Sequence, residues 1–422
     1  MTKRASTKKK STSLTPAGIA GAILVILAAI VFAITGVDLT GGNLSNQVNV
    51  TMVGSGVATE RMPTVGASAV ATPNASNTVV ASVGGVQALT LTNAFGFQKD
   101  FWRVYFTVPQ SSTNRSLWMG GMEDELVTAI KSATRTLDIA AFEWESEKMT
   151  EAVLFALANN VTIRMVVDDD HGLNNPDTTL GELEAVGVPI VNDNRSGLMH
   201  NKFIIIDGLT VWAGSMNYQP NDLFRNNNNV IALRSKPAAD VFTAEFNEMF
   251  VDKKFGKTSP QINTGNLNQN GTNIQIYFGA ENTVLASVIS EVNAATSSVR
   301  FATFSFTDFD LAKAMMDKAA SGVGVSGVFE TTGSMTEAAE LKTLYCAGIP
   351  VFQDGNAGVL HDKMIIVDGT TVITGSFNFS SNAANNNDEN LMIIKNADIA
   401  QLYLQEWDRI RAIAKAPKGI SC

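Results

Sequence analysis

The stretch His200-Asn-Lys202-Phe-Ile-Ile-Ile-Asp207-Gly-Leu-Thr-Val-Trp-Ala-Gly214-Ser215-Met-Asn217 decides the fold, because the chain contains it twice. The second copy reads His361-Asp-Lys363-Met-Ile-Ile-Val-Asp368-Gly-Thr-Thr-Val-Ile-Thr-Gly375-Ser376-Phe-Asn378. Every residue of the first copy lies 161 positions before its counterpart (361 − 200 = 161), without a gap. An internal duplication explains this recurrence better than chance.

Each copy predicts a strand, a tight turn and a second strand. His and Lys two positions apart face the same side of a strand, while residues 203–206 and 364–367 fill the core. The Asp-Gly pairs are typical of tight turns. Residues 211–213 and 372–374 therefore form a returning strand, which delivers Gly-Ser-x-Asn to the end of the hairpin that carries the histidine.

The sequence around both copies alternates strand-like and helix-like segments in the same order. They are 102–108, 123–132, 137–144, 148–159, 162–167 and 180–186, then 274–278, 284–295, 299–306, 311–320, 325–329 and 335–347. This order predicts an α/β chain with two homologous β/α sandwich domains, at residues 99–256 and 273–417. Pro260 and a run of Asn, Gly and Thr indicate a linker at 257–272.

The first 98 residues have a different composition. A basic tail (1–15) precedes an apolar run (16–37), which is long enough as a helix to cross a bilayer. We interpret the run as a transmembrane signal anchor with a cytoplasmic N-terminus and extracytoplasmic catalytic domains. A cleaved signal peptide is the alternative, but its apolar region is usually shorter. Residues 38–98, rich in Ser, Thr, Asn and Gly, are interpreted as a flexible stalk.

Charge and cysteine content limit the function classes. Five of the 31 basic residues lie in the tail, so the remainder carries 26 basic and 40 acidic residues (26 − 40 = −14). Such a chain has no global attraction for nucleic acid or anionic lipid. Cys346 and Cys422 are too few for a disulfide framework. A buried apolar Cys346 and a frayed end at Cys422 are favoured over a bridge between them.

The residue types in the two copies suit phosphoryl transfer. This chemistry requires a nucleophile, a proton donor for the leaving oxygen, and hydrogen-bond donors around the phosphate oxygens. Two His, two Lys, two Ser and two Asn meet these needs without a metal. The predicted phosphate-binding residues are Ser215, Asn217, Ser376 and Asn378.

The doubled pattern His-x-Lys-x4-Asp followed by Gly-Ser-x-Asn resembles the signature of the phospholipase D superfamily. The resemblance covers both copies. It implies two domains related by a two-fold axis, whose motifs meet in one active site where a phosphohistidine forms. By analogy His200 is the nucleophile and His361 the general acid, with no cofactor, no metal and no obligate protein partner. The implied catalytic residues are His200, Lys202, Asp207, His361, Lys363, Asp368 and Glu389.

One position distinguishes the two copies. The family places an acidic residue 28 positions after the histidine, where it orients an imidazole. Glu389 fits this position (389 − 361 = 28), but its counterpart in the first copy is Asn228. The two histidines are therefore expected to titrate differently. The cluster from Asp168 to His171 could bind a metal, but we favour a solvated loop, because the second copy has Glu330-Thr-Thr-Gly333 there.

Nucleic acid is the favoured substrate class at this point, only slightly ahead of phospholipid. The run from Ser376 to Asn390 resembles the compact endonuclease branch, which favours nucleic acid. The alternative is a phospholipase D or phosphatidyltransferase acting on membrane phospholipid, which the acidic charge and the predicted anchor support. An inactive phosphate-binding module is the third hypothesis, and the intact motifs argue against it.

Overall fold

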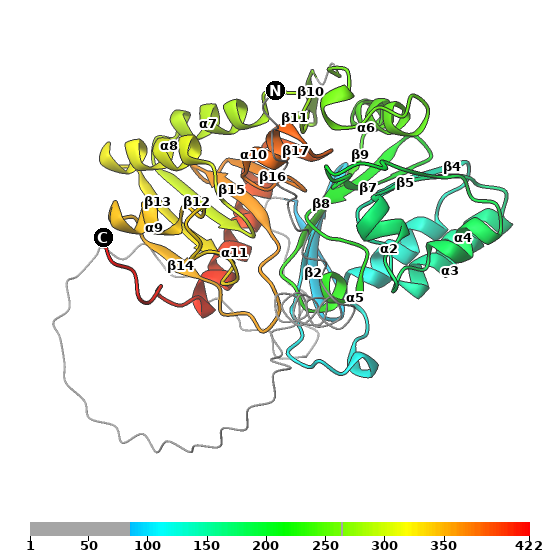
Figure 1. Cartoon of the computed structure of the whole chain (residues 1–422), viewed down its shortest axis with the longest axis horizontal. Helices are drawn as coiled ribbons and strands as arrows, with labels where there is room; N and C mark the ends of the chain where they lie inside the picture. The colour runs from blue at the N-terminus through cyan, green and yellow to red at the C-terminus, as the bar shows by residue number, and fades with distance from the viewer. Residues whose placement is uncertain (1–84, 263–264) are drawn as a thin grey trace, which may run out of the picture. The chain divides into compact units, whose positions relative to one another are not determined.

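The computed structural model describes residues 85–262 and 265–422, which belong to one compact unit (Figure 1). The predicted basic tail and anchor, and the stalk up to residue 84, lie outside the described residues. Within the described part of the chain, no helix is long and apolar enough to cross a bilayer.

Two sheets form the centre of the two repeats, and helices cover them (Figure 1). The first sheet has nine strands in the order β1-β2-β3-β9-β8-β7-β4-β5-β6, and the second has eight in the order β10-β11-β17-β16-β15-β12-β13-β14. The first-repeat strands are β1 Gln87–Leu89, β2 Ala94–Lys99, β3 Trp102–Thr107, β4 Thr136–Ala141, β5 Thr162–Val167, β6 Ile190–Asn192, β7 Lys202–Ile206, β8 Thr210–Gly214 and β9 Asn229–Arg234. The second-repeat strands are β10 Asn266–Gln269, β11 Thr272–Phe278, β12 Ser298–Thr303, β13 Gly324–Phe329, β14 Val351–Gln353, β15 Lys363–Val367, β16 Thr371–Gly375 and β17 Asn390–Lys395.

The helices follow the same duplicated order. In the first repeat they are α2 Gly121–Lys131, α3 Glu147–Ala158, α4 Leu180–Ala185, α5 Pro220–Phe224 and α6 Lys236–Phe250. In the second they are α7 Val284–Ala294, α8 Phe309–Ala320, α9 Leu341–Cys346, α10 Ser381–Asn385 and α11 Ala397–Ile413. The helix expected at 335–347 is thus confined to α9, while the remaining expected elements are present with small shifts at their ends.

The motif hairpins lie in the middle of their sheets. β7 pairs antiparallel with β4 and β8, and β15 pairs in the same way with β12 and β16. All five residues of each first strand are buried. Alternate side chains of β7 point to opposite faces, so Ile204 packs into a core within the first repeat. Phe203 packs into a core that both repeats share. This shared core fixes the two motifs relative to each other.

The domain boundaries differ from the predicted ones. β1 and β2 belong to the first sheet, so the sheet begins inside the predicted stalk (38–98). β10 pairs with β11 inside the predicted linker (257–272), through a turn at Asn270 and Gly271, whose φ angles are 48° and 77°. These strands are short and polar, and therefore resemble connecting segments in sequence.

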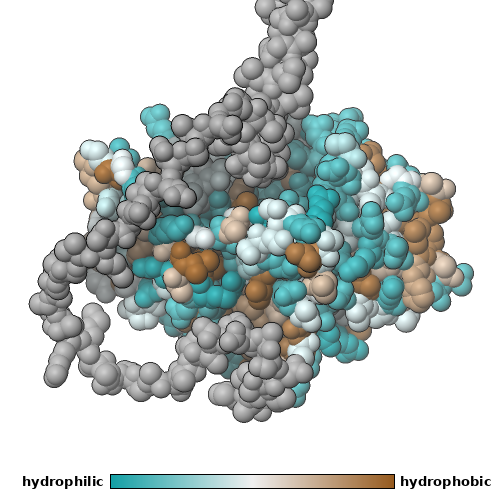
Figure 2. Space-filling model, turned by 90° about the horizontal axis from the view of Figure 1, so that it is seen from below, coloured by the Kyte–Doolittle hydropathy of each residue, from teal (hydrophilic) through white to brown (hydrophobic). Residues whose placement is uncertain are grey.

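The C-terminus is part of the second repeat. Cys346 of α9 and Cys422 form a disulfide, so the expectation of two unpaired cysteines was wrong. Lys415 also pairs with Gln353 at the edge of the sheet, and the ordered chain continues past the predicted end at 417. On the face shown in Figure 2, hydrophilic side chains are mixed with apolar areas, the broadest of which lies toward the right edge of the view.

Candidate active site

The backbone of each repeat holds the histidine of the other. His200 N donates to Asp388 O at 2.9 Å, and His361 N donates to Asn227 O at 2.9 Å. Bridges between Met199 and Asp388, and between Asn227 and Leu360, continue these contacts. Both imidazoles lie at the junction of the repeats and are mostly buried, at 6% and 8% exposure. The structure therefore brings the two motifs together across the junction.

Glu389 is the partner of His200, the histidine of the opposite repeat. His200 Nδ1 lies 2.7 Å from Glu389 Oε2, which also accepts a hydrogen bond from Ser376 Oγ at 2.7 Å. Burial raises the pKa of Glu389 to about 7, although Lys202 and Ser376 lower it. Burial and the charges of Lys202 and Lys363 hold the pKa of His200 well below its usual value. His200 is therefore neutral near pH 7, and its Nδ1 faces a glutamate whose own pKa is about 7.

His361 has two acceptors at Nδ1. Asn228 Oδ1 lies at 3.0 Å and Asp222 Oδ1 at 3.2 Å. Burial and the charge of Lys363 together lower the pKa of His361 to about 4, although Asp222 opposes the shift. The sequence analysis identified Asn228 but missed Asp222, which lies in the short helix α5 six positions earlier. Its counterpart is Ala383 (383 − 222 = 161), so the repeat pattern gave no signal for it.

Asp222 is held as a carboxylate by several donors. Asn226 Nδ2 and Asn228 Nδ2 donate to Oδ1 at 2.9 and 2.8 Å, and Gln219 Nε2 donates to Oδ2 at 3.0 Å. Burial opposes ionisation, but His361 and these amides lower the pKa of Asp222. A buried, ionised carboxylate thus faces the second imidazole.

Each lysine of the two motifs contacts the backbone of the histidine two residues before it. Lys202 Nζ donates to His200 O, and Lys363 Nζ donates to His361 O, each at 2.7 Å. The ammonium groups also lie over the rings of Phe142 and Phe304, at 4.7 and 5.0 Å from the centroids. Burial lowers the pKa of Lys202 to about 8 and that of Lys363 to about 7. An anionic ligand would favour their charged forms.

The predicted phosphate-binding residues divide into two kinds. Ser215 and Ser376 are fully buried, and their hydroxyls donate to Asn228 Oδ1 and Glu389 Oε2. These serines orient the partners of the histidines. In contrast, Asn217 Oδ1 and Asn378 Oδ1 have no hydrogen-bond partner among the described residues. The side-chain oxygens of Asn217 and Asn378 are thus acceptors that no described residue engages.

Asp207 and Asp368 lie at the opposite ends of the motif strands, away from the histidines. Each occupies the turn after its strand with a positive φ, at 56° and 52°. Asp207 accepts hydrogen bonds from the backbone N–H groups of residues 134–136, and Asp368 from those of residues 296–298. The structure does not bring either carboxylate to the site, and their contacts stabilise the turns instead.

The cluster between Asp168 and His171 is only partly a solvated loop. Asp170 and His171 are exposed, but Asp168 is 1% exposed. Asp168 accepts hydrogen bonds from the backbone N–H of His171 and that of Met199, the residue before His200. Glu330 accepts from Leu360 N in the same way in the second repeat. Both acids position the segment that carries the histidine.

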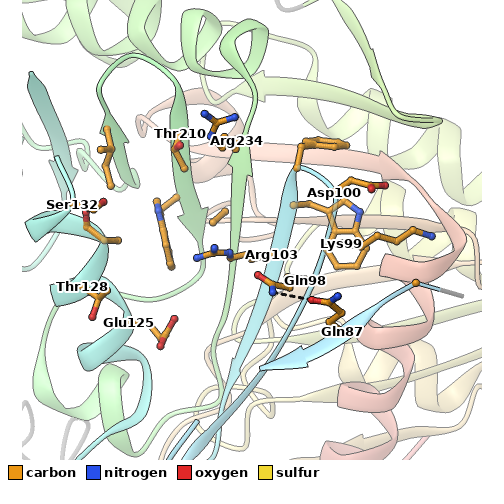
Figure 3. Close-up of a pocket in the computed structure, with 17 residues that line it drawn as sticks. Gln87, Gln98, Lys99, Asp100, Arg103, Glu125, Thr128, Ser132, Thr210 and Arg234 are labelled. Atoms are coloured by element: carbon orange, nitrogen blue, oxygen red, sulfur yellow. Dashed lines mark hydrogen bonds between the residues drawn. The ribbon is translucent and has the colours of Figure 1, made fainter. Parts of the chain in front are cut away.

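A separate cavity of about 610 Å³ lies in the first repeat (Figure 3). Its lining includes Gln87, which accepts a hydrogen bond from Gln98 Nε2 at 3.2 Å, and the charged residues Arg103, Glu125 and Arg234. Ile206 and Thr210 also line it, at the turn end of the β7–β8 hairpin. The histidines lie at the other end of that hairpin, so this cavity is distinct from the site described above.

Known proteins share the duplicated domain. The family described as cardiolipin synthase, PLD-like domain, matches residues 126–250 and 288–411. Phospholipase D of Rickettsia bellii is 30% identical over 149 residues, covering 35% of this chain and 74% of that protein. Mitochondrial cardiolipin hydrolase of Mus musculus is 32% identical over 126 residues, covering 30% of this chain and 57% of that protein.

A solved structure extends the likeness of fold to both repeats. Phosphatidylserine synthase from Haemophilus influenzae superposes with a TM-score of 0.57 at 15% identity, covering 71% of this chain and 86% of that one. Together with the matched family, the paired motifs identify the class of enzyme. The chain is a phosphodiesterase of the phospholipase D superfamily.

Proposed function

We propose that the protein hydrolyses phosphodiesters through a phosphohistidine on His200, with His361 as the proton donor. The observation that carries this proposal is the unequal pairing of the two imidazoles. His200 Nδ1 lies 2.7 Å from Glu389, while His361 Nδ1 faces Asn228 and the carboxylate of Asp222. In both histidines the partners engage Nδ1, which leaves Nε2 for the substrate.

In the first step, His200 Nε2 attacks phosphorus and forms a P–N bond. The P–O bond to the leaving group breaks, and His361, which the bound phosphate anion and the Asp222 carboxylate favour as the imidazolium, gives its Nε2 proton to the departing oxygen. In the second step, His361 accepts a proton from water, whose oxygen attacks phosphorus. The P–N bond breaks, and the products are a phosphomonoester and free His200.

The remaining groups position the phosphate. Lys202 and Lys363 supply positive charge to the phosphate oxygens, and the amides of Asn217 and Asn378 donate to them. Phe142 and Phe304 pack against His200 and His361 with centroids 4.8 and 5.1 Å apart, which fixes the imidazole planes. A small displacement of either imidazole would impair in-line attack.

Phospholipid is the substrate class that we place first. The relatives that match one repeat are named phospholipase D and mitochondrial cardiolipin hydrolase. The excess of acidic residues also weakens the electrostatic attraction on which non-specific nucleic-acid binding depends. Nucleic acid is the second candidate, because the segment from Ser376 to Asn390 resembles the endonuclease branch.

The proposed location is the outer side of a membrane, with residues 16–37 as the anchor. The disulfide between Cys346 and Cys422 supports this location, since disulfides persist in oxidising compartments. To test this location, a Cys is introduced at Ser11 or at Ser112, and intact cells are treated with a membrane-impermeant thiol reagent. The anchor model predicts labelling at position 112 but not at position 11.

The substrate experiment uses the full-length chain in detergent, with and without EDTA. It is incubated with phosphatidylcholine vesicles or with plasmid DNA, and free choline and nicked DNA are measured. We expect choline release that His200→Ala abolishes. DNA cleavage without choline release would favour the second candidate, and no product from either substrate would support the inactive binding module.

A further inference from the structure

Helices α6 and α11 occupy equivalent positions in the two repeats. They differ at one charged position, which is acidic in α6 and basic in α11. Glu245 of α6 corresponds to Glu406 of α11, and Glu248 corresponds to Arg409 (409 − 248 = 161). In α11, Arg409 Nε donates to Glu406 Oε2 at 2.8 Å, and Nη2 donates to Thr107 O at 3.1 Å. The guanidinium thus neutralises the buried Glu406 and reaches the other repeat.

In the first repeat, a carboxylate stands at the position where the second repeat has the arginine that neutralises its buried glutamate. Glu248 stands at the position of the arginine, and Glu281, which follows β11 of the second repeat, joins Glu245 and Glu248. One oxygen from each carboxylate lies within 4.8 Å of the others. Glu245 and Glu248 are 1% and 4% exposed. Three acidic groups thus converge without the guanidinium that the other repeat supplies.

Several of these oxygens lack a partner. Glu245 Oε2, Glu248 Oε1 and Glu281 Oε1 are buried and make no hydrogen bond of normal geometry to a described residue. Their polar neighbours are the Ser259 hydroxyl beside Glu248, and the carboxyl groups of Glu245 and Glu281 beside each other. An unpaired buried carboxylate is costly unless a cation or a proton neutralises it. Burial raises the pKa of Glu248 and that of Glu281 to about 7, so protonation is the alternative to a bound cation.

We propose that Glu245, Glu248 and Glu281 bind a hard divalent cation, which takes the place of the Arg409 guanidinium in the first repeat. Oxygen ligands surround Ca²⁺ at about 2.3–2.6 Å, so ligands on opposite sides of the ion are roughly 5 Å apart. The spread of the three carboxylates, within 4.8 Å, suits such an ion, with water completing its shell.

The cation would link the two repeats. It would also hold Glu245, which contacts the segment that carries His200. Glu245 and Glu248 belong to the first repeat and Glu281 to the second. Glu245 Oε1 also accepts a hydrogen bond from Asn201 Nδ2 at 3.1 Å, and Asn201 lies between His200 and Lys202. The ion would act as a structural cross-link, separate from the groups that face the phosphate, so this inference is independent of the proposed reaction.

The test measures metal content and thermal stability rather than activity. The full-length chain is stripped with EDTA, exchanged into 1 mM Ca²⁺ or Mg²⁺, passed through a desalting column and analysed by mass spectrometry for bound metal. We expect about one ion per chain and a melting temperature about 3 °C or more above that of the stripped protein. A wild-type chain that retains no metal and shows no shift would mean that the cluster holds protons.

Glu248→Arg is the matched variant, because it copies the second repeat. We expect it to bind no metal and to show the same melting temperature with and without Ca²⁺. An equal Ca²⁺ shift in wild type and Glu248→Arg would place the ion elsewhere and overturn the assignment. If Glu248→Arg fails to fold, Glu281→Gln serves instead, and it should weaken binding at least tenfold by calorimetric titration.

Discussion

Asp222 Oδ1 lies 3.2 Å from His361 Nδ1, so a carboxylate of the first repeat faces the histidine of the second. Glu389 Oε2 faces His200 at 2.7 Å in the reciprocal arrangement. The acids occupy different positions, however: the counterpart of Glu389 is Asn228, and the counterpart of Asp222 is Ala383. The first repeat therefore combines an orienting amide with a carboxylate from a neighbouring helix, where the second uses one residue for both roles.

Asp222→Asn is expected to slow turnover by about ten- to a hundredfold, because it removes the charge that stabilises the imidazolium of His361. Loss of a negative neighbour lowers the pKa of His361 further below its value of about 4. The alkaline limb of the profile of kcat/KM against pH should therefore move to lower pH. An unchanged profile would show that Asp222 has only a structural role.

A double exchange provides the control for Asp222. Asp222→Ala combined with Asn228→Glu gives the first repeat the residues that the second has at Ala383 and Glu389. We expect the double variant to recover at least a tenth of the wild-type rate, while Asp222→Ala alone stays well below it. Equal activity of the single and double variants would mean that the carboxylate position cannot be exchanged between the repeats.

Glu389→Gln should preserve packing, because Gln is close in size and can still accept from Ser376 Oγ. It removes the charge beside His200, lowers the pKa of that imidazole and slows turnover by roughly ten- to a thousandfold. Asn228→Asp should also slow turnover, because it removes the amide that donates to Asp222 Oδ1 at 2.8 Å and places a second carboxylate beside it. Steady-state rates across the pH range test this, and small, equal effects of both changes would contradict an electrostatic role.

His200→Ala and His361→Ala are each expected to remove nearly all activity toward a substrate with an alkyl leaving group. Nucleophile and acid act as one unit, so their losses are not additive. If either single variant kept more than about a tenth of the wild-type rate, the two histidines would not share one site.

Asp368→Asn is expected to lower stability by about 1–2 kcal/mol and to change kcat by less than twofold. Although burial opposes it, backbone N–H donors lower the pKa of Asp368, so its carboxylate contributes stability above the unfolded pKa of about 4. That contribution is lost as pH falls through the folded pKa. Urea unfolding at pH 7 and pH 3 should show a smaller difference between variant and wild type at the lower pH.

The sequence allowed much of the site to be predicted, because the duplication preserves both residue identity and spacing. His200, Lys202, His361 and Lys363 lie at the ends of the predicted hairpins, and the two motifs meet at the junction of the repeats, as the family resemblance implied. The fold class followed from the same repeat, together with the alternation of strand-like and helix-like segments. The acidic residue at Glu389 was also correct in position, although only the structure shows that it pairs with the opposite histidine.

Other features depend on contacts between distant segments. Asp222 could not be inferred from the repeat, because its counterpart Ala383 carries no charge. The resemblance implied that Asp368 is catalytic, because the family signature includes it, but its spacing from His361 reflects the length of the strand and its turn. The disulfide could not be predicted, because it depends on the C-terminal segment folding back against α9, and no local sequence pattern indicates this.

Trapping of the phosphohistidine tests the central claim most directly. In His361→Ala, a substrate with a p-nitrophenolate leaving group needs no proton donor, whereas hydrolysis of the intermediate lacks its base, so the adduct should accumulate. After rapid denaturation at alkaline pH and proteolysis, mass spectrometry should find the phosphoryl group on the peptide that contains His200. The parallel His200→Ala variant should give no adduct. Label on His361 in His200→Ala, or no covalent adduct in either variant, would contradict the account.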